Sequence, residues 1–175
     1  MNIKDLIRTV PHFPHEGIMF RDVTTLLKDP KGLKETTRLL KEDLKDLEFD
    51  VVAGIESRGF IMGSILAHEF GKGFVPIRKK GKLPGQTVSI DYELEYGTDT
   101  LEVHIDAFNK GDKVLLIDDL LATGGTAIGA TKLVEKLGAE VVTFSVIIDL
   151  PELKGKEKLT RLGHKVHTLV EFEGL

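Results

Sequence analysis

The chain has 175 residues, enough for one domain, and its formal net charge of -4 argues against a nucleic-acid-binding surface, which usually needs a strongly basic face. It contains no cysteine, which excludes disulfides, thiolate metal sites and a cysteine nucleophile. No apolar run approaches the roughly 18 residues that span a bilayer, and the N-terminal MNIKDLIRTV lacks the features of a signal peptide. We therefore expect a cytoplasmic protein whose partners include neither nucleic acid nor membrane.

Apolar runs and segments with helical spacing alternate along most of the chain. The runs are rich in β-branched residues and continuous, as in strands of a parallel sheet that is covered on both faces. The intervening segments repeat apolar residues every three or four positions, which favours helices. Strands are predicted at 50–55, 113–118 and 140–148, and helices at 33–47, 59–70 and 127–137. This order is typical of an α/β fold with a central, mostly parallel sheet flanked by helices.

The segment RKKGKLPGQTVSIDYELEY, residues 78–96, interrupts this alternation. It opens with basic residues, and Pro84-Gly85 then indicates a turn. The partly alternating TVSIDYELEY that follows predicts a β-hairpin with residues 100–105. Such a long polar excursion is typical of a lid over a site, and a solvated surface hairpin is the alternative.

The stretch VLLIDDLLATGGT, residues 114–126, indicates a binding site. Asp118 and Asp119 come at the carboxyl end of a predicted parallel strand, where ligands bind in open α/β sheets. The next helix begins after Ala122-Thr123-Gly124-Gly125-Thr126, so free backbone N–H groups can bind a phosphate there. Adjacent carboxylates suit two vicinal hydroxyls, which together predicts a sugar phosphate site. Alternatively, Thr126 only caps a helix and the aspartates are solvated turn residues.

Other segments carry less specific signals. GIESRGF follows the first predicted strand, and its Ser57-Arg58-Gly59 turn can bind a second anion, unless Ser57 only caps a helix. The basic cluster of residues 78–82 is typical of a solvated face. Taken alone, Phe20 is typical of a core residue and Glu95 of an exposed strand residue.

VLLIDDLLATGGT resembles the phosphoribosyl-pyrophosphate (PRPP) motif of the type I phosphoribosyltransferases, in the form found in members that act on adenine. Five further segments resemble the same members in order. They are FPHEGIMFRDVTTLLKDP (13–30), GIESRGFIMG (54–63), IRKKGKLPG (77–85), YELEYGTDTLEVH (92–104) and ELKGKEKL (152–159). The resemblance implies the type I phosphoribosyltransferase fold as a single domain over residues 1–175. It also implies a small N-terminal hood, about residues 1–30, and a flexible β-hairpin loop, about residues 78–100.

The resemblance also implies roles for individual residues. Asp118 and Asp119 would hold the ribose hydroxyls, and Ala122, Thr123, Gly124, Gly125 and Thr126 the 5′-phosphate. Pyrophosphate would contact Glu56, where the family often has Asp, with Ser57, Arg58, Arg78 and Lys82. Adenine would lie against Met19, Phe20, Arg21 and Leu120. Glu95, Arg58 and Tyr96 would be the catalytic residues, with Glu95 receiving or relaying the proton from N9.

The implied reaction converts adenine and PRPP into AMP and pyrophosphate. Mg²⁺ is the implied cofactor, bound through PRPP with no direct protein ligand, and the implied assembly is a homodimer. A phosphoribosyltransferase for another base and a PRPP-sensing regulator are the alternatives. The intact MFRD and LEY segments argue against the first alternative. The acidic charge and the basic segment 78–82 argue against the second.

Overall fold

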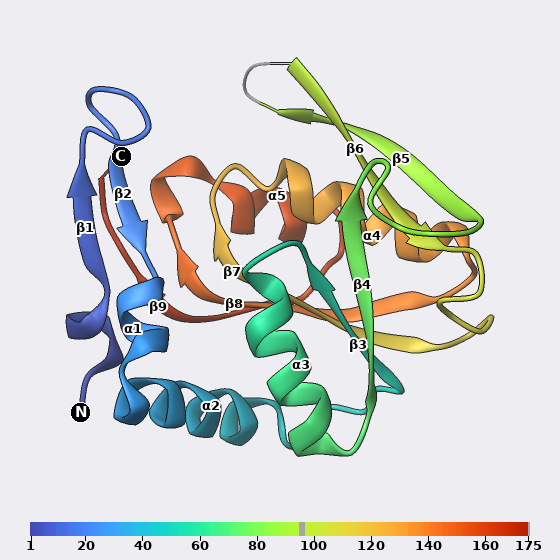
Figure 1. The fold of residues 1–175 in the computed structure, drawn as a ribbon, viewed down its shortest axis with the longest axis horizontal. Coiled ribbons are helices and arrows are strands. Elements are labelled where there is room, and N and C mark those ends of the chain that lie inside the picture. Colours follow the sequence, from blue (N-terminus) through green and yellow to red (C-terminus); the bar gives the residue numbers. More distant parts are fainter. Residues whose placement is uncertain (95–96, 175) are drawn as a thin grey trace.

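A seven-stranded sheet forms the centre of the computed structural model, which describes residues 1–94 and 97–174 (Figure 1). The strand order is β5-β6-β4-β3-β7-β8-β9, and neighbours from β4 to β9 run parallel. The strands are β3 (Val51–Ile55), β4 (Gly73–Lys79), β5 (Thr87–Leu94), β6 (Gly97–His104), β7 (Lys113–Leu121), β8 (Glu140–Asp149) and β9 (Val166–Glu171). The predicted mostly parallel sheet is confirmed, and its parallel part consists of β4, β3, β7, β8 and β9.

Helices cover both faces of the sheet. The helices are α2 (Pro30–Leu44), α3 (Gly59–Phe70), α4 (Gly125–Lys136) and α5 (Gly155–Arg161). Leu115 of β7 belongs to the apolar cluster that contains Leu66 of α3, whereas its neighbour Leu116 belongs to the cluster that contains Leu133 of α4. Burial on both faces explains why this strand reads as a continuous apolar run. No helix within the described residues combines the length and apolarity that a membrane span needs.

Several element boundaries differ from those predicted. β7 continues past Asp118 to Leu121, because Leu120 and Leu121 still pair with β8. α4 begins at Gly125, two residues early, so the end of the predicted loop forms its first turn. α2 begins at Pro30 because the Asp29 side chain accepts hydrogen bonds from the backbone N–H groups of its first turn.

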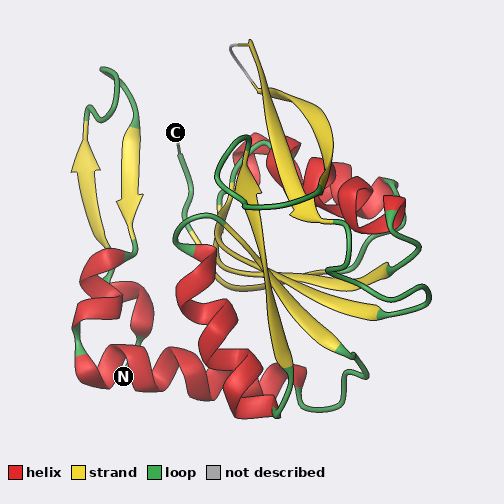
Figure 2. Ribbon diagram, turned by 45° about the vertical axis from the view of Figure 1, so that its right-hand side comes forward, coloured by secondary structure: helices red, strands yellow, loops and turns green. Residues whose placement is uncertain are grey.

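Two antiparallel ribbons rise on the same side of the molecule (Figures 1 and 2). The first consists of β1 (Arg8–Pro11) and β2 (Met19–Asp22), between a 3₁₀ turn at Ile3–Leu6 and α1 (Thr24–Lys28). The second is the β5–β6 hairpin, which confirms the hairpin predicted from the polar excursion. It extends the sheet through β4 and packs on α4, where the buried Tyr92 lies against Gly129.

Candidate active site

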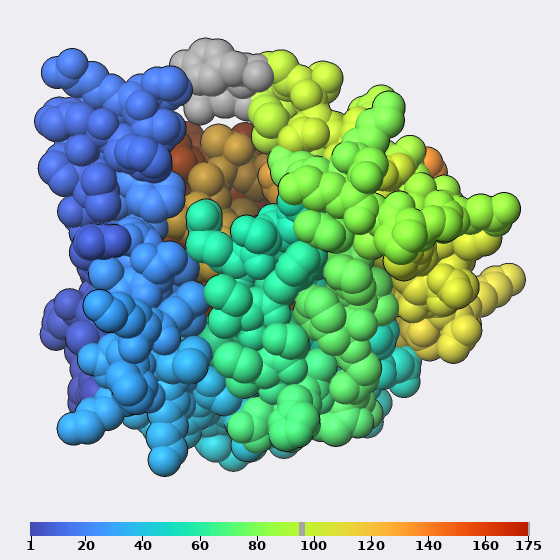
Figure 3. Space-filling model, viewed as in Figure 1, coloured from blue at the N-terminus to red at the C-terminus, as the bar shows by residue number. Residues whose placement is uncertain are grey.

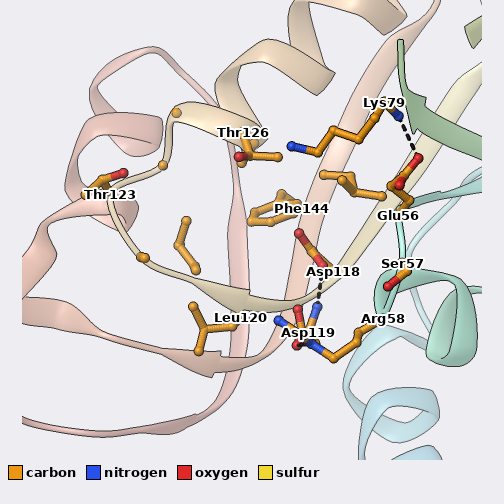
Figure 4. Close-up of a pocket in the computed structure, with 16 residues that line it drawn as sticks. Glu56, Ser57, Arg58, Lys79, Asp118, Asp119, Leu120, Thr123, Thr126 and Phe144 are labelled. Atoms are coloured by element: carbon orange, nitrogen blue, oxygen red, sulfur yellow. Dashed lines mark hydrogen bonds and ion pairs between the residues drawn. The ribbon is translucent and has the colours of Figure 1, made fainter. Parts of the chain in front are cut away.

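A cavity of about 430 Å³ lies beyond the carboxyl ends of β3 and β7 (Figure 4). In the space-filling view, the surface is hollowed between the N-terminal segment and α3, with β7 and later residues at the bottom (Figure 3). The lining residues are Ile55, Glu56, Ser57, Arg58, Lys79, Asp118, Asp119, Leu120, Leu121, Ala122, Thr123, Gly124, Gly125, Thr126, Ala127 and Phe144. The structure therefore gathers both predicted anion loops and both aspartates around one space.

The loop between β7 and α4 presents unpaired backbone N–H groups. Gly124 is the N-cap residue of α4 and has φ +92, a conformation that glycine adopts without steric cost. No side chain among the described residues caps this helix, so Thr126 does not cap it. The first turn of the helix can consequently donate to an anion, assisted by the helix dipole.

Asp118 and Asp119 differ in their surroundings although they are adjacent. The Asp118 carboxylate points into the cavity and accepts a hydrogen bond from the backbone N–H of Asp119 at 2.8 Å (Figure 4). Burial, followed by the negative charge of Asp119, raises the pKa of Asp118 well above its usual value. Asp119 is only 8% exposed, and its Oδ2 accepts from Nε of Arg58 at 2.5 Å. Asp119, which is predicted to bind the ribose, is thus joined to Arg58, which is predicted to bind pyrophosphate.

Glu56 gathers the basic residues of the predicted pyrophosphate site. Its carboxylate accepts from Nζ of Lys82 at 2.9 Å and from the backbone N–H of Lys79 at 2.6 Å, and Arg78 approaches at 3.3 Å. Burial opposes its ionisation, but these hydrogen bonds and the charges of Lys82 and Arg78 hold the pKa of Glu56 below its usual value. Arg78 and Lys82 therefore meet at Glu56, at the rim of the cavity, and are not among the residues that line it.

Sequence reasoning assigned no role to Lys79, yet its side chain lines the cavity (Figure 4). Its ammonium group donates to the hydroxyl of Tyr92 at 2.9 Å and also binds Asp99. Because side chains alternate along β4, Lys79 and Arg78 point to opposite faces of the strand. That alternation at the end of a parallel strand was the signal that could have found Lys79. Phe144, a further apolar residue that lines the cavity, also went unpredicted.

The predicted adenine residues are divided between two places. Leu120 lines the cavity, whereas Met19, Phe20 and Arg21 lie on β2 and are not among the lining residues. The guanidinium of Arg58 lies 5.9 Å from the ring centroid of Phe20 and so connects the two places. The Arg21 side chain instead donates to Thr9 at 2.6 Å and to the carbonyl oxygen of Glu173 at 3.1 Å. Glu95 and Tyr96 lie outside the described residues.

The fold and this arrangement of loops define the class of protein. A model of the phosphoribosyl transferase domain matches residues 22–166, and the chain belongs to this family. A curated adenine phosphoribosyltransferase from Nitrosospira multiformis is 58% identical over 174 residues, 99% of each chain. The crystal structure of adenine phosphoribosyltransferase from Thermoanaerobacter pseudethanolicus is 47% identical, with a TM-score of 0.93, over 97% of this chain and 98% of its own.

A structure of the Saccharomyces cerevisiae enzyme contains adenine and an imino-altritol bisphosphate. That enzyme is 40% identical to this chain, with a TM-score of 0.87 and 96% of each chain covered. The relative and the two solved structures each match at least 96% of this chain.

Proposed function

We propose that the protein transfers the 5-phosphoribosyl group of PRPP to N9 of adenine, giving AMP and pyrophosphate in purine salvage. The observation that carries the proposal is the cavity in which Asp118 and Asp119 face an uncapped helix N-terminus. Two carboxylates next to an anion site match the hydroxyls and the 5′-phosphate of one ribose phosphate. The adenine-specific names of the relatives supply the identity of the base.

In this proposal, ground-state binding positions the ribose carbon C1′. The backbone N–H groups and hydroxyls of the loop from Ala122 to Thr126 hold the 5′-phosphate, and the two aspartates accept from the ribose hydroxyls. The bond from C1′ to the pyrophosphate oxygen breaks while the bond from C1′ to N9 forms. In the transition state between these two events, positive charge develops on the ribose ring, close to the carboxylates of Asp118 and Asp119. Positioning and electrostatics therefore account for most of the rate.

The departing pyrophosphate requires cations and hydrogen-bond donors. We assign Ser57 and Arg58 to this subsite, together with Arg78 and Lys82 once they leave Glu56. Lys82 lies on the short connection between β4 and β5, so this rearrangement needs to move only that connection and the end of β4. We propose that the segment of about residues 78–100 closes over PRPP and excludes water, since hydrolysis is the competing reaction.

The β1–β2 ribbon is proposed to be the hood over adenine, within one domain of residues 1–175. Phe20 would stack on the base, backbone groups of Met19 and Arg21 would read its amino edge, and Leu120 would cover its other face. The engagement of the Arg21 side chain with Glu173 supports a backbone role for that residue. N9 loses a proton when it bonds to C1′, and Glu95, accompanied by Tyr96, stays the predicted acceptor or relay on the family resemblance alone.

Mg²⁺ fits the site as a metal carried by the substrate. No group of three or more potential ligand side chains occurs in residues 1–94 and 97–174, and Asp119 is already paired with Arg58. When bound to PRPP oxygens, the ion would neutralise part of the pyrophosphate charge. We also propose a cytoplasmic location, on the basis of the cysteine-free composition. The family resemblance further suggests a homodimer. Light scattering of the purified protein tests the dimer.

The proposal is tested by incubating the protein with PRPP, Mg²⁺ and adenine and measuring AMP and pyrophosphate. Equal amounts of both products are expected. Asp119→Asn should reduce kcat/KM for PRPP by about 100-fold, because it weakens both the hydroxyl contact and the pairing of Arg58. Asp46→Asn, at an exposed carboxylate of the opposite end of the fold, is the control. Pyrophosphate without AMP would contradict transfer to adenine.

A further inference from the structure

The segment 152–159 resembles the family, but the proposed function gives it no task. It connects β8 to α5 through a 3₁₀ turn at Pro151–Leu153. Lys154 follows in the left-handed conformation, with φ 63, and Gly155 is the first residue of α5. Gly155 is buried, although the rest of the first turn of α5 is exposed. Its surroundings therefore explain why a glycine stands there.

Gly155 packs directly on the phosphate loop. A Cβ atom at this position would lie 2.4 Å from the carbonyl oxygen of Ala122 and 3.1 Å from the backbone nitrogen of Gly124. It would also lie 2.9 Å from a methyl carbon of Leu121. Since two of these three atoms belong to backbone, no rotamer change relieves the overlap, and the loop itself would have to move.

The contact is close from the other side as well. A Cβ atom on Gly124 would lie 3.1 Å from the Cα of Gly155, so two backbones touch where neither residue carries a side chain. The backbone N–H of Leu150 also donates to the carbonyl oxygen of Leu121 at 3.0 Å. The segment of residues 150–155 thereby contacts the loop at both of its ends, although Gly155 is 31 positions away from Gly124 in the sequence.

We propose that Gly155 is a positioning residue for the 5′-phosphate: its missing side chain lets α5 support the loop in the conformation that directs N–H groups at the phosphate. The inference rests on the proposed function. It predicts that an added methyl group at residue 155 displaces Ala122 and Gly124 and weakens ligands that carry a 5′-phosphate. The proposed pyrophosphate subsite, with Ser57 and Arg58 after β3 and with Arg78 and Lys82 at and beyond the end of β4, lies on other elements and is left intact.

The test compares Gly155→Ala with Gly73→Ala by calorimetry. Gly73 is a matched control, because a Cβ there would meet nothing within 4 Å. For Gly155→Ala, the Kd of ribose 5-phosphate should rise between about ten- and a hundred-fold, the effect of a displacement near 1 Å, while pyrophosphate binds as to the wild type. Gly73→Ala should bind both ligands normally. Unchanged binding of ribose 5-phosphate, or an equal loss for both ligands, would overturn the inference.

A second measurement uses the wild-type protein and so does not depend on the folding of a variant. Ribose 5-phosphate should slow amide hydrogen exchange in the peptide of residues 151–161, because a loop held by ligand also restrains the backbone packed on it. Unchanged exchange in that peptide, with slowed exchange in residues 122–128, would refute the role of Gly155 alone. Failure of the wild type to bind either PRPP or ribose 5-phosphate would instead refute the proposed function.

Discussion

Asp118 illustrates at the scale of one residue how position alters chemistry. Its carboxyl group is partly buried beside a second carboxylate, and both effects raise its pKa. The folded protein therefore retains the Asp118 proton at a pH where an ordinary aspartate has lost it. A ribose hydroxyl donates best to the ionised form, so affinity for PRPP should depend on this titration.

We predict that PRPP binding weakens as the pH falls through the raised pKa of Asp118. Calorimetric titrations over a range from neutral to acid pH would show a larger loss of PRPP affinity for the wild type than for Asp118→Asn, which has no carboxyl to protonate. At the upper end of this range, Asp118→Asn should bind about tenfold more weakly than the wild type. Because both proteins meet the same titrating ligand, parallel pH profiles for the two would contradict the prediction.

Asp149, at the end of β8, is a second buried acid and is 1% exposed. Its Oδ1 has no hydrogen-bond partner among the described residues, and burial together with the charge of its β9 partner Glu171 raises its pKa. The folded state then binds the proton more tightly than the unfolded chain. Its stabilisation by protonation is present at low pH and is lost as the pH rises through the raised pKa.

Asp149→Asn should accordingly stabilise the protein at neutral pH, on the order of 1 kcal/mol, because it removes a carboxylate whose burial and proximity to Glu171 outweigh its attraction to Lys156 and Leu150. The gain should disappear under acid conditions, below the usual aspartate pKa. Urea unfolding at neutral and at acid pH measures this change in unfolding free energy. Asp46→Asn, at an exposed position, should leave the unfolding free energy unchanged at both pH values. A loss of stability at neutral pH would mean that the carboxylate has a favourable partner.

At the scale of elements, Glu56 joins the end of β3 to β4 and to the connection that leads into the hairpin. The resemblance predicts that this residue contacts pyrophosphate, and its carboxylate pairs with Arg78 and Lys82, two other residues of the predicted pyrophosphate site. Pyrophosphate would have to take Lys82 and Arg78 from a carboxylate that is only 8% exposed. In the proposed function, Glu56 and pyrophosphate would therefore compete for the same positive charges.

We predict that Glu56→Gln tightens pyrophosphate binding by about three- to ten-fold at low salt, since the glutamine amide competes less for Lys82 and Arg78. Glu102→Gln is the control, because the hydrogen bonds that Glu102 accepts among the described residues come from Gly81, on the β4–β5 connection, and from Thr87 of β5, and not from Lys82 or Arg78. Calorimetry gives the Kd of pyrophosphate for each protein with and without Mg²⁺. Weaker binding by Glu56→Gln would show that the carboxylate itself helps to hold pyrophosphate.

At the scale of the whole molecule, the two apolar clusters meet at β7, so the strand that carries the aspartates is also the centre of the core. We predict that Leu116→Ala, at a fully buried position of β7, costs about 2–5 kcal/mol of unfolding free energy. Leu162→Ala, at a side chain that is 56% exposed, should cost less than about 0.5 kcal/mol. Similar unfolding midpoints for both variants in urea would contradict this account of the core.

Much of the fold could be predicted because its signals are local. The β3, β7 and β8 strands read as continuous apolar runs, and the bounds of α3 match those predicted. The extension of β7 to Leu121 could not be predicted, because it depends on pairing with β8. The start of α2 was missed although Asp29-Pro30 is a local capping signal.

The features of the candidate site also divide into those that a local sequence pattern predicts and those that depend on contacts between distant segments. The loop at Gly124 and the two aspartates are contiguous in sequence, so their pattern predicted one place for a phosphate and a diol. The pairing of Glu56 with Lys82 depends on β3 lying beside β4, which no local pattern contains. The packing of Gly155 on Gly124 joins the first residue of α5 to the loop before α4, a contact that became visible only in three dimensions.

The measurement that tests the central claim most directly is pyrophosphate release from PRPP and Mg²⁺ with adenine, guanine, hypoxanthine or xanthine in parallel reactions. We predict release with adenine, with AMP as its product, and little release with the other bases. Release with a different base would keep the ribose phosphate site and contradict the assignment of the β1–β2 ribbon to adenine. PRPP binding without release in any reaction would contradict the claim that this protein is an enzyme.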